Sequence, residues 1–213
     1  MSINIAGGAE EDGVVIGNTF NKYGSKNPIV KWMINGFEKS LSGFVEGSSP
    51  LSIHEIGCGE GYWVIRWSQQ GLSVRGSDFS RDVIEIARGN ASNHGLPTSL
   101  FQTRNVYEVD AEVDTADLVV CCEVLEHLED PELGLQALQK ITTQSLILSV
   151  PREPLWRVLN LARGKYICKL GNTPGHIQHW SKREFLQLVS RYFEVVEVKN
   201  PLPWIMIFCR PYK

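Results

Sequence analysis

Three glycines alternate with other residues in the segment HEIGCGEGYW, at Gly57, Gly59 and Gly61. Glycine permits positive φ angles and lets backbone N–H groups approach a ligand closely at the start of a helix. The spacing is GxGxG, whereas a dinucleotide fingerprint needs GxGxxG, and the GK[ST] of a phosphate-binding P-loop is absent. By itself this glycine loop predicts either a small-molecule site or only a tight turn between a strand and a helix.

A carboxylate follows the glycine loop at Asp78, at the end of the next predicted strand. In this position a carboxylate can accept both hydrogen bonds from a ribose diol. The alternative is a turn or helix-capping role, but Ser80 already supplies a cap. Loop and acid together indicate a ligand that contains adenosine.

Acidic and imidazole side chains gather in two later segments, EVLEHLEDP and GHIQHWSKREF. On a helical or turn path, Glu123, Glu126 and His127 could lie on neighbouring faces. Histidine titrates near neutral pH, so His127 could take a proton from a hydroxyl or contact a substrate. The alternative is a structural histidine that is hydrogen-bonded within its loop. His176 and His179 follow a glycine that suggests a turn, and we expect one of them to face solvent.

The elements that must position these residues alternate between strand and helix, which favours an α/β fold. We expect a Rossmann-like, doubly wound, mainly parallel seven-stranded sheet with a C-terminal antiparallel hairpin and a small lid insertion. In the first helix, an apolar face is expected to hold Ile29, Trp32, Met33 and Phe37. The expected strands are 51–57, 72–78, 99–106, 116–124, 145–151, 194–200 and 204–210, and the expected helices are 28–46, 62–71, 81–95, 131–142 and 181–193.

The predicted domain organisation is a flexible N-terminal arm (1–27) followed by a single domain (28–213) that carries a substrate lid at 151–180. The first twenty residues of the lid contain five cationic residues against one acid, Glu153. Three interpretations remain open for this segment: a solvated helix on the rim, a lid over an anionic or apolar substrate, and a shallow helix at a membrane surface. The cationic residues are Arg152, Arg157, Arg163, Lys165 and Lys169.

The amino-acid composition favours a globular domain over a DNA-binding, secreted or membrane-spanning protein. The chain has 213 residues, a formal net charge of −3 and 43% hydrophobic residues, which is typical of a globular domain and argues against a dedicated DNA-binding protein. Its five cysteines form no CxxC pair, so we expect reduced thiols. The N-terminus does not resemble a secretory signal, and no run is apolar enough to span a membrane. These features favour a cytoplasmic protein that is a monomer or weak homodimer.

Taken in order, HEIGCGEGYW, GSDFS, RNVYEV and CCEVLEHLEDP resemble the class I S-adenosylmethionine-dependent methyltransferases over about residues 50–150. The resemblance implies that the glycine loop, including Cys58, lines the methionine portion of the cosubstrate and that Glu55 reaches its amino group. It implies ribose contacts from Asp78 and a position beside adenine for Phe79. The remaining cofactor residues implied are Asn105, which stands where the family usually has an acid, Val106 after it, and Glu123 near the methyl donor.

Within the family, the phrase ExxEH followed by a later histidine resembles the ubiquinone-pathway O-methyltransferases and the small-RNA 2′-O-methyltransferases. There the constellation is associated with a divalent metal, which would make Glu123, Glu126, His127 and His176 its ligands. Similar phrases occur in metal-free methyltransferases, so we favour the version without metal, in which His127 and His176 are the candidate catalytic residues.

The arm is expected to close over the cosubstrate through Tyr23, Lys26 and Lys31, with Lys31 pairing with the methionine carboxylate. The expected function is methyl transfer from S-adenosylmethionine to a small-molecule or lipid acceptor, most simply at a hydroxyl oxygen. Two alternatives stay open: an RNA 2′-O-methyltransferase that uses the basic lid as a phosphate track, and a non-catalytic subunit that binds S-adenosylmethionine for a partner.

Overall fold

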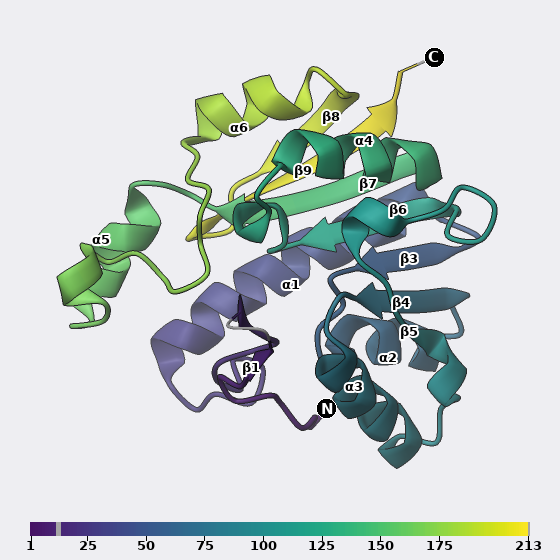
Figure 1. Cartoon of the computed structure of the whole chain (residues 1–213), viewed down its shortest axis with the longest axis horizontal. Coiled ribbons are helices and arrows are strands. Elements are labelled where there is room, and N and C mark those ends of the chain that lie inside the picture. Colours follow the sequence, from purple (N-terminus) through teal and green to yellow (C-terminus); the bar gives the residue numbers. More distant parts are fainter. Residues whose placement is uncertain (12–13, 213) are drawn as a thin grey trace.

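A seven-stranded sheet forms the centre of the protein in the computed structural model, which describes residues 1–11 and 14–212 (Figure 1). The strand order is β5-β4-β3-β6-β7-β9-β8, and only β9 runs antiparallel to its neighbours β7 and β8. This is the expected doubly wound sheet with a C-terminal antiparallel hairpin. The strands are β3 (Ile53–Ile56), β4 (Val74–Asp78), β5 (Phe101–Thr103), β6 (Ala116–Cys122), β7 (Thr142–Pro151), β8 (Phe193–Lys199) and β9 (Trp204–Pro211).

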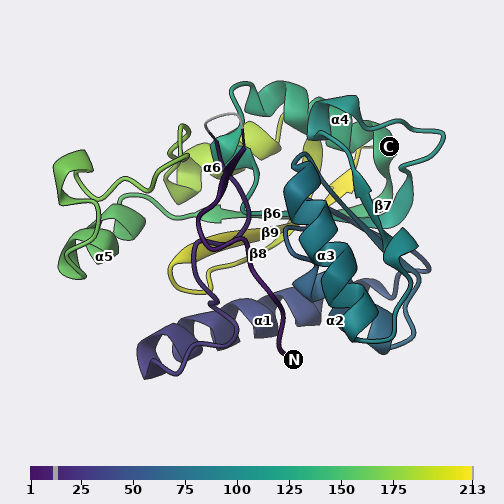
Figure 2. The ribbon, with the colours of Figure 1, turned by 60° about the horizontal axis from the view of Figure 1, so that its bottom comes forward.

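Helices cover both faces of the sheet (Figure 2). Successive side chains of a strand point to opposite faces, so Leu118 and Val120 of β6 join one apolar core while Val119 and Cys121 join the other. The first core is completed by α1, α2 and α3, and the second by α4 and α6. The α-helices are α1 (Pro28–Ser48), α2 (Tyr62–Gln69), α3 (Arg81–Asn93), α4 (Pro131–Ile141), α5 (Leu155–Ala162) and α6 (Lys182–Val189). Among the described residues there are also four short 3-10 helices, at Thr98–Leu100, Val106–Glu108, Leu125–His127 and Ile167–Lys169.

The apolar face expected for the first helix is wrong at two positions. Phe37 is buried together with Ile34, but Ile29 and Trp32 are 67% and 61% exposed. The helix extends past the sheet at its N-terminal end, where Asn27 caps it, so its first turns have no strand beneath them (Figure 2).

The N-terminal arm is not loose in the structure. It contains a small hairpin of β1 (Glu10–Glu11) and β2 (Val14–Val15), and the side chains of Ile3 and Ile16 are buried. Backbone N–H groups of Ala6 and Asn18 donate hydrogen bonds to the Glu60 carboxylate at 3.0 and 2.6 Å. Because Glu60 belongs to the glycine loop, the arm is tied directly to that loop.

The lid contains the helix α5, and its return segment packs against that helix. Asn160 is buried on the inner side of α5 and donates to the Gly171 carbonyl at 2.8 Å. The inner Trp156 indole donates to Thr173 Oγ1 at 2.9 Å. The two hydrogen bonds hold the return segment of the lid against α5. Among the described residues, no helix is long and apolar enough to cross a membrane.

A buried histidine links β3 to β4 and to the loop that precedes β6. His54 of β3 contacts the Asp114 carbonyl through Nδ1 at 2.8 Å and Ser77 Oγ of β4 through Nε2 at 2.5 Å. Burial lowers the pKa of His54 to about 4, an effect that the Asp114 carbonyl partly opposes and Arg75 reinforces. His54 is therefore neutral in the folded protein down to this pH.

This shift predicts a loss of stability in mild acid. The pKa of a histidine in the unfolded chain is about 6.5, whereas that of folded His54 is about 4. Between these two pH values His54 is protonated in the unfolded chain but not in the folded protein, so the free energy of unfolding falls as the pH falls. The His54 contribution to this loss should be about 2 kcal/mol between roughly pH 7 and pH 5. Urea unfolding of wild type and His54→Gln at both pH values measures it by difference.

Candidate functional site

The glycine loop joins β3 to α2 at the carboxyl end of the parallel strands. Gly57 and Gly61 have φ angles of 75° and 84°, a region that favours glycine. A side chain at Gly57 would collide with Val124, and one at Gly61 would lie 2.5 Å from the Phe101 ring. The N–H groups of Gly57 and Cys58 both donate to the Ser77 carbonyl, at 2.7 and 3.0 Å. The loop is thus fixed in a conformation that requires glycine at positions 57 and 61. The absence of side chains at these positions allows a ligand to approach the backbone closely.

Asp78 ends β4 directly beside this loop. Its Oδ2 accepts a hydrogen bond from the Gly59 N–H at 3.0 Å, and its Oδ1 accepts one from the Ser80 N–H at 3.1 Å. Burial raises the pKa of Asp78, while these backbone donors oppose the rise. Phe79 follows with its side chain 48% exposed, unlike most phenylalanines of the fold. Acid and ring are therefore adjacent, as a ribose and adenine site requires.

Glu55 lies within β3 below the glycine loop, and one oxygen of its carboxyl group is unpartnered. Its Oε2 is buried and has no hydrogen-bond partner among the described residues. Burial raises the pKa of Glu55 well above its usual value, and the positive charge of Lys22 acts in the opposite direction. A buried acceptor without a donor is costly, so the site favours a cationic or N–H donor ligand. The α-ammonium of S-adenosylmethionine is such a donor.

Asn105 and Val106 stand at the end of β5, on the same edge of the sheet. The side-chain amide oxygen Oδ1 of Asn105 accepts the Tyr107 N–H at 3.1 Å and so caps the turn Val106–Glu108. An amide oxygen has a second lone pair, which leaves room for the adenine contact expected from the family. Val106 is buried.

The arm supplies Tyr23 and Lys22 to this edge of the sheet. Tyr23 stacks on Tyr62 with ring centroids 3.5 Å apart, and its hydroxyl accepts the Trp63 indole N–H at 3.0 Å. Lys22 is close enough for its charge to act on the buried carboxylates of Glu55 and Glu126 and on the half-buried carboxylate of Glu123. The sequence reasoning missed Lys22. Lys31 is exposed on α1, so its assignment to the methionine carboxylate stays a prediction.

Glu123 follows β6 in a backbone conformation that non-glycine residues rarely adopt, with φ at 60°. Its carboxylate accepts hydrogen bonds from Ser149 Oγ at 3.1 Å and from the Trp204 indole at 2.6 Å. Burial raises its pKa to about 7. Both oxygens of Glu123 are thus already occupied by neighbouring strands.

Glu126, His127 and His176 converge beside Glu123, with one ligand atom of each residue within 4.8 Å of the others. Both carboxylate oxygens of Glu126 are buried, and neither has a hydrogen-bond partner among the described residues. Burial and the nearby Glu123 charge raise the pKa of Glu126 well above its usual value. The His127 and His176 rings meet edge to face at 4.9 Å. Of the four metal ligands that the family resemblance implies, three are brought together in this group.

The two histidines differ in what their nitrogens contact. His127 Nδ1 lies 2.9 Å from the Gly175 carbonyl. A carbonyl can only accept, so Nδ1 carries the proton and Nε2 keeps a lone pair. His176 is buried against Trp156, and burial lowers its pKa to about 3, so its ring is neutral at physiological pH.

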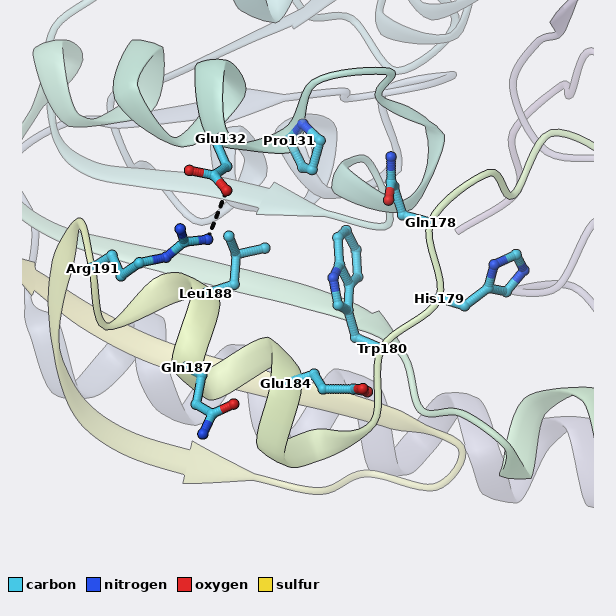
Figure 3. A pocket seen from close by; sticks show the side chains of 9 residues that line it. All are labelled: Pro131, Glu132, Gln178, His179, Trp180, Glu184, Gln187, Leu188 and Arg191. Carbon is cyan, nitrogen blue, oxygen red and sulfur yellow. Dashed lines mark hydrogen bonds and ion pairs between the residues drawn. The ribbon is translucent and has the colours of Figure 1, made fainter.

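His179 lies outside the group of Glu126, His127 and His176. It lines a surface pocket of about 530 Å³ between the start of α4 and α6, together with Trp180 and Arg191 (Figure 3). The charges there are satisfied within the protein, because Arg191 pairs with Glu132 at 2.8 Å and Glu184 accepts the Ser181 N–H at 2.8 Å. His176 therefore points into the group with Glu126, and His179 does not.

A family model described as a methyltransferase domain matches residues 34–198. The chain belongs to this methyltransferase domain family. A ubiquinone biosynthesis O-methyltransferase from Pectobacterium atrosepticum is 30% identical over 101 residues, which cover 47% of this chain and 42% of that protein. The corresponding protein of Rickettsia conorii is 29% identical over 154 residues, covering 71% of this chain and 51% of its own length. The chain thus spans about half the length of the curated relatives that it matches.

Solved structures confirm the fold expected for a methyltransferase domain. Magnesium protoporphyrin IX methyltransferase from Synechocystis, solved with bound S-adenosylhomocysteine, has a TM-score of 0.67 at 20% identity and covers 89% of this chain and 90% of its own. The PH0226 protein of Pyrococcus horikoshii has a TM-score of 0.70 at 17% identity and covers 91% and 96% of the two chains. At these identities the likeness concerns the fold alone.

Replacing Asp78 with alanine should weaken S-adenosylmethionine binding by about 1.5–3 kcal/mol, the range for hydrogen bonds to a charged group. Isothermal calorimetry with S-adenosylmethionine or its demethylated product measures this change. Asp82→Ala in the exposed first turn of α3 is the matched control and should bind as wild type does. Unchanged affinity of the Asp78 variant would remove this carboxylate from the site.

The positions of Lys22 and Lys31 predict different roles in cosubstrate binding. Lys22→Met should weaken S-adenosylmethionine binding about tenfold, because a hydrogen-bonded charge contributes roughly 1.5 kcal/mol. Lys31→Met, at an exposed position, is measured beside it by the same calorimetry. A loss confined to Lys31→Met would restore the assignment made from the sequence and reject Lys22.

Proposed function

We propose that this methyltransferase domain moves the methyl group of S-adenosylmethionine to a hydroxyl oxygen of a small-molecule or lipid acceptor. The observation that carries the proposal is the position of the group Glu126–His127–His176 at the same edge of the sheet as Glu55 and Asp78. The O-methyltransferase names of the relatives support an oxygen acceptor.

Cosubstrate binding follows from the unsatisfied groups of the site. Asp78 would accept hydrogen bonds from the ribose hydroxyls, and Phe79 would cover the adenine. Glu55 Oε2 would receive the α-ammonium group, which gives this buried acceptor the donor it lacks. Lys22 supplies the positive charge of the arm beside these carboxylates. Methyl transfer from a sulfonium is an in-line displacement, so fixing donor and acceptor in this way supplies much of the acceleration.

A hydroxyl acceptor must also lose its proton. The Nε2 lone pair of His127 is the group available for this step, because Nδ1 is held by the Gly175 carbonyl. The His176 ring packs edge to face against His127, and Trp156 packs against His176. Loss of a general base costs about 10²–10⁴ in rate.

The same group of residues fits a divalent metal ion. One carboxylate and two neutral imidazoles form a donor set that several divalent ions accept, and both Glu126 oxygens lack partners. The ligands would be Glu126, His127 and His176. When bound, such an ion would act as a Lewis acid on the acceptor oxygen. In the metal-free version Nε2 of His127 accepts the proton of the hydroxyl, and in the metal version His127 is a ligand of the ion. The effect of a chelator on turnover distinguishes the two versions.

If His127 is the base, His127→Ala should lower turnover about 10²–10⁴-fold while chelator has no effect. If the group holds a metal, chelator should abolish turnover, and Glu126→Gln should abolish both turnover and the binding of Mn²⁺ measured by calorimetry on the purified protein. Turnover is followed with labelled S-adenosylmethionine against hydroxylated acceptors. His179→Ala is the control that should remain active in either version. Full activity both in His127→Ala and with chelator would overturn the role of this group.

A further inference from the structure

Glu60 of the glycine loop has a buried carboxylate that is hydrogen-bonded to the N-terminal arm. The residue is 1% exposed. Its carboxylate accepts the backbone N–H of Ala6 at 3.0 Å and that of Asn18 at 2.6 Å, and it also accepts the side-chain amide of Asn18. In the part of the chain that the structure describes, every hydrogen-bond donor to this carboxylate comes from the arm. Because a buried carboxylate without donors is costly, Glu60 favours the attached position of the arm.

The arm forms a loop around this carboxylate and runs between α1 and α3 (Figures 1 and 2). The Gly7 N–H donates to the Asn18 carbonyl at 3.0 Å, so the two sides of the loop meet beside Glu60. Asn90 of α3 exchanges two hydrogen bonds with the backbone of Asn4, at 2.8 and 3.0 Å, and also donates to the Glu60 carbonyl at 2.9 Å. Both the backbone and the side chain of Glu60 are therefore part of the attachment.

Lys22 lies between two attached points of the arm. Asn18 is held by Glu60, and the Tyr23 hydroxyl accepts the Trp63 indole N–H at 3.0 Å. The four residues from Asn18 to Lys22 can span at most about 14 Å, so the attachment at Asn18 restricts where Lys22 can lie. In this position the charge of Lys22 acts on the buried carboxylates at the edge of the sheet.

We propose that Glu60 is a positioning residue for S-adenosylmethionine, which fixes the arm so that Lys22 lies beside the methionine portion. The inference rests on the proposed function, because it needs the cosubstrate to bind beside Glu55. The alternative is a purely local role, in which an acid just before α2 stabilises the N-terminal end of that helix through its dipole. The two roles differ in whether the effect of Glu60 passes through the arm.

A double-mutant cycle in cosubstrate binding separates the two roles. Glu60→Gln turns one acceptor oxygen into an N–H donor that faces the donors of the arm. It should weaken S-adenosylmethionine binding in calorimetry about tenfold, as Lys22→Met should. Since both changes remove one and the same contribution, the double variant should bind within about twofold of either single variant.

Asn18→Asp tests the same attachment from the side of the arm and leaves the glycine loop unchanged. It places a second carboxylate against that of Glu60, and the two repel each other. We expect about the same tenfold loss of affinity, again without a further loss when Lys22→Met is added. This variant keeps the test decisive if Glu60→Gln does not fold.

Limited digestion with trypsin reports on the arm without any cosubstrate. Cleavage after Lys22 and Lys26 should be at least about tenfold faster in Glu60→Gln and Asn18→Asp than in wild type, because cleavage follows the population of the opened arm. Glu10→Gln, the same substitution at an exposed position of the arm, is the matched control. It should be digested and should bind S-adenosylmethionine as wild type does.

Three results overturn the inference while wild type binds S-adenosylmethionine normally. They are unchanged affinity in both Glu60→Gln and Asn18→Asp, losses that multiply when Lys22→Met is added, and digestion of the arm at the wild-type rate in both variants. Wild-type protein that does not bind S-adenosylmethionine overturns the proposed function, and the inference with it.

Discussion

Burial of negative charge at one edge of the sheet is the constraint on which the site depends. Glu55, Asp78, Glu123 and Glu126 all come from the carboxyl ends of neighbouring parallel strands or the loops directly after them. Burial raises the pKa of each of them. Such a cluster requires donors and cations. Backbone N–H groups donate hydrogen bonds to Asp78, and the side chains of Ser149 and Trp204 donate to Glu123. The positive charge of Lys22 acts on Glu55 and Glu126. Among the described residues, Glu55 Oε2 and both oxygens of the Glu126 carboxylate have no hydrogen-bond donor.

The sheet could be predicted because its sequence signals are local. Buried strands contain continuous apolar runs, such as 118–122 in β6, and Gly57, Gly61, Pro131 and Ser181 mark the ends of elements through the backbone angles or caps they provide. The expected antiparallel ending is also present, with β9 between β7 and β8.

The errors and omissions concern contacts between distant segments. Nothing in the arm's composition shows that Ala6 and Asn18 will bind Glu60, because the partner is about forty residues or more away. Lys22 was missed for the same reason, because the carboxylates on which its charge acts belong to strands and loops that are distant in the sequence. Periodicity placed Ile29 and Trp32 on the buried face of the first helix, but burial also requires a strand beneath the helix, and α1 extends past the sheet there. The meeting of Glu126 with His176 depends on the path of the lid, and before the structure only the family resemblance implied it.

The attachment of the arm has a consequence for where this domain begins. The family match starts at residue 34, inside α1. The residues before it nevertheless supply Lys22 and Tyr23, and Gly17 lies so close to Glu60 Oε1 that a β-carbon there would be 2.5 Å away. The wall of the proposed cosubstrate site is therefore assembled from two stretches of chain, of which the family model covers one. A change in the first stretch can then alter cosubstrate affinity while the glycine loop and every other matched motif stay the same.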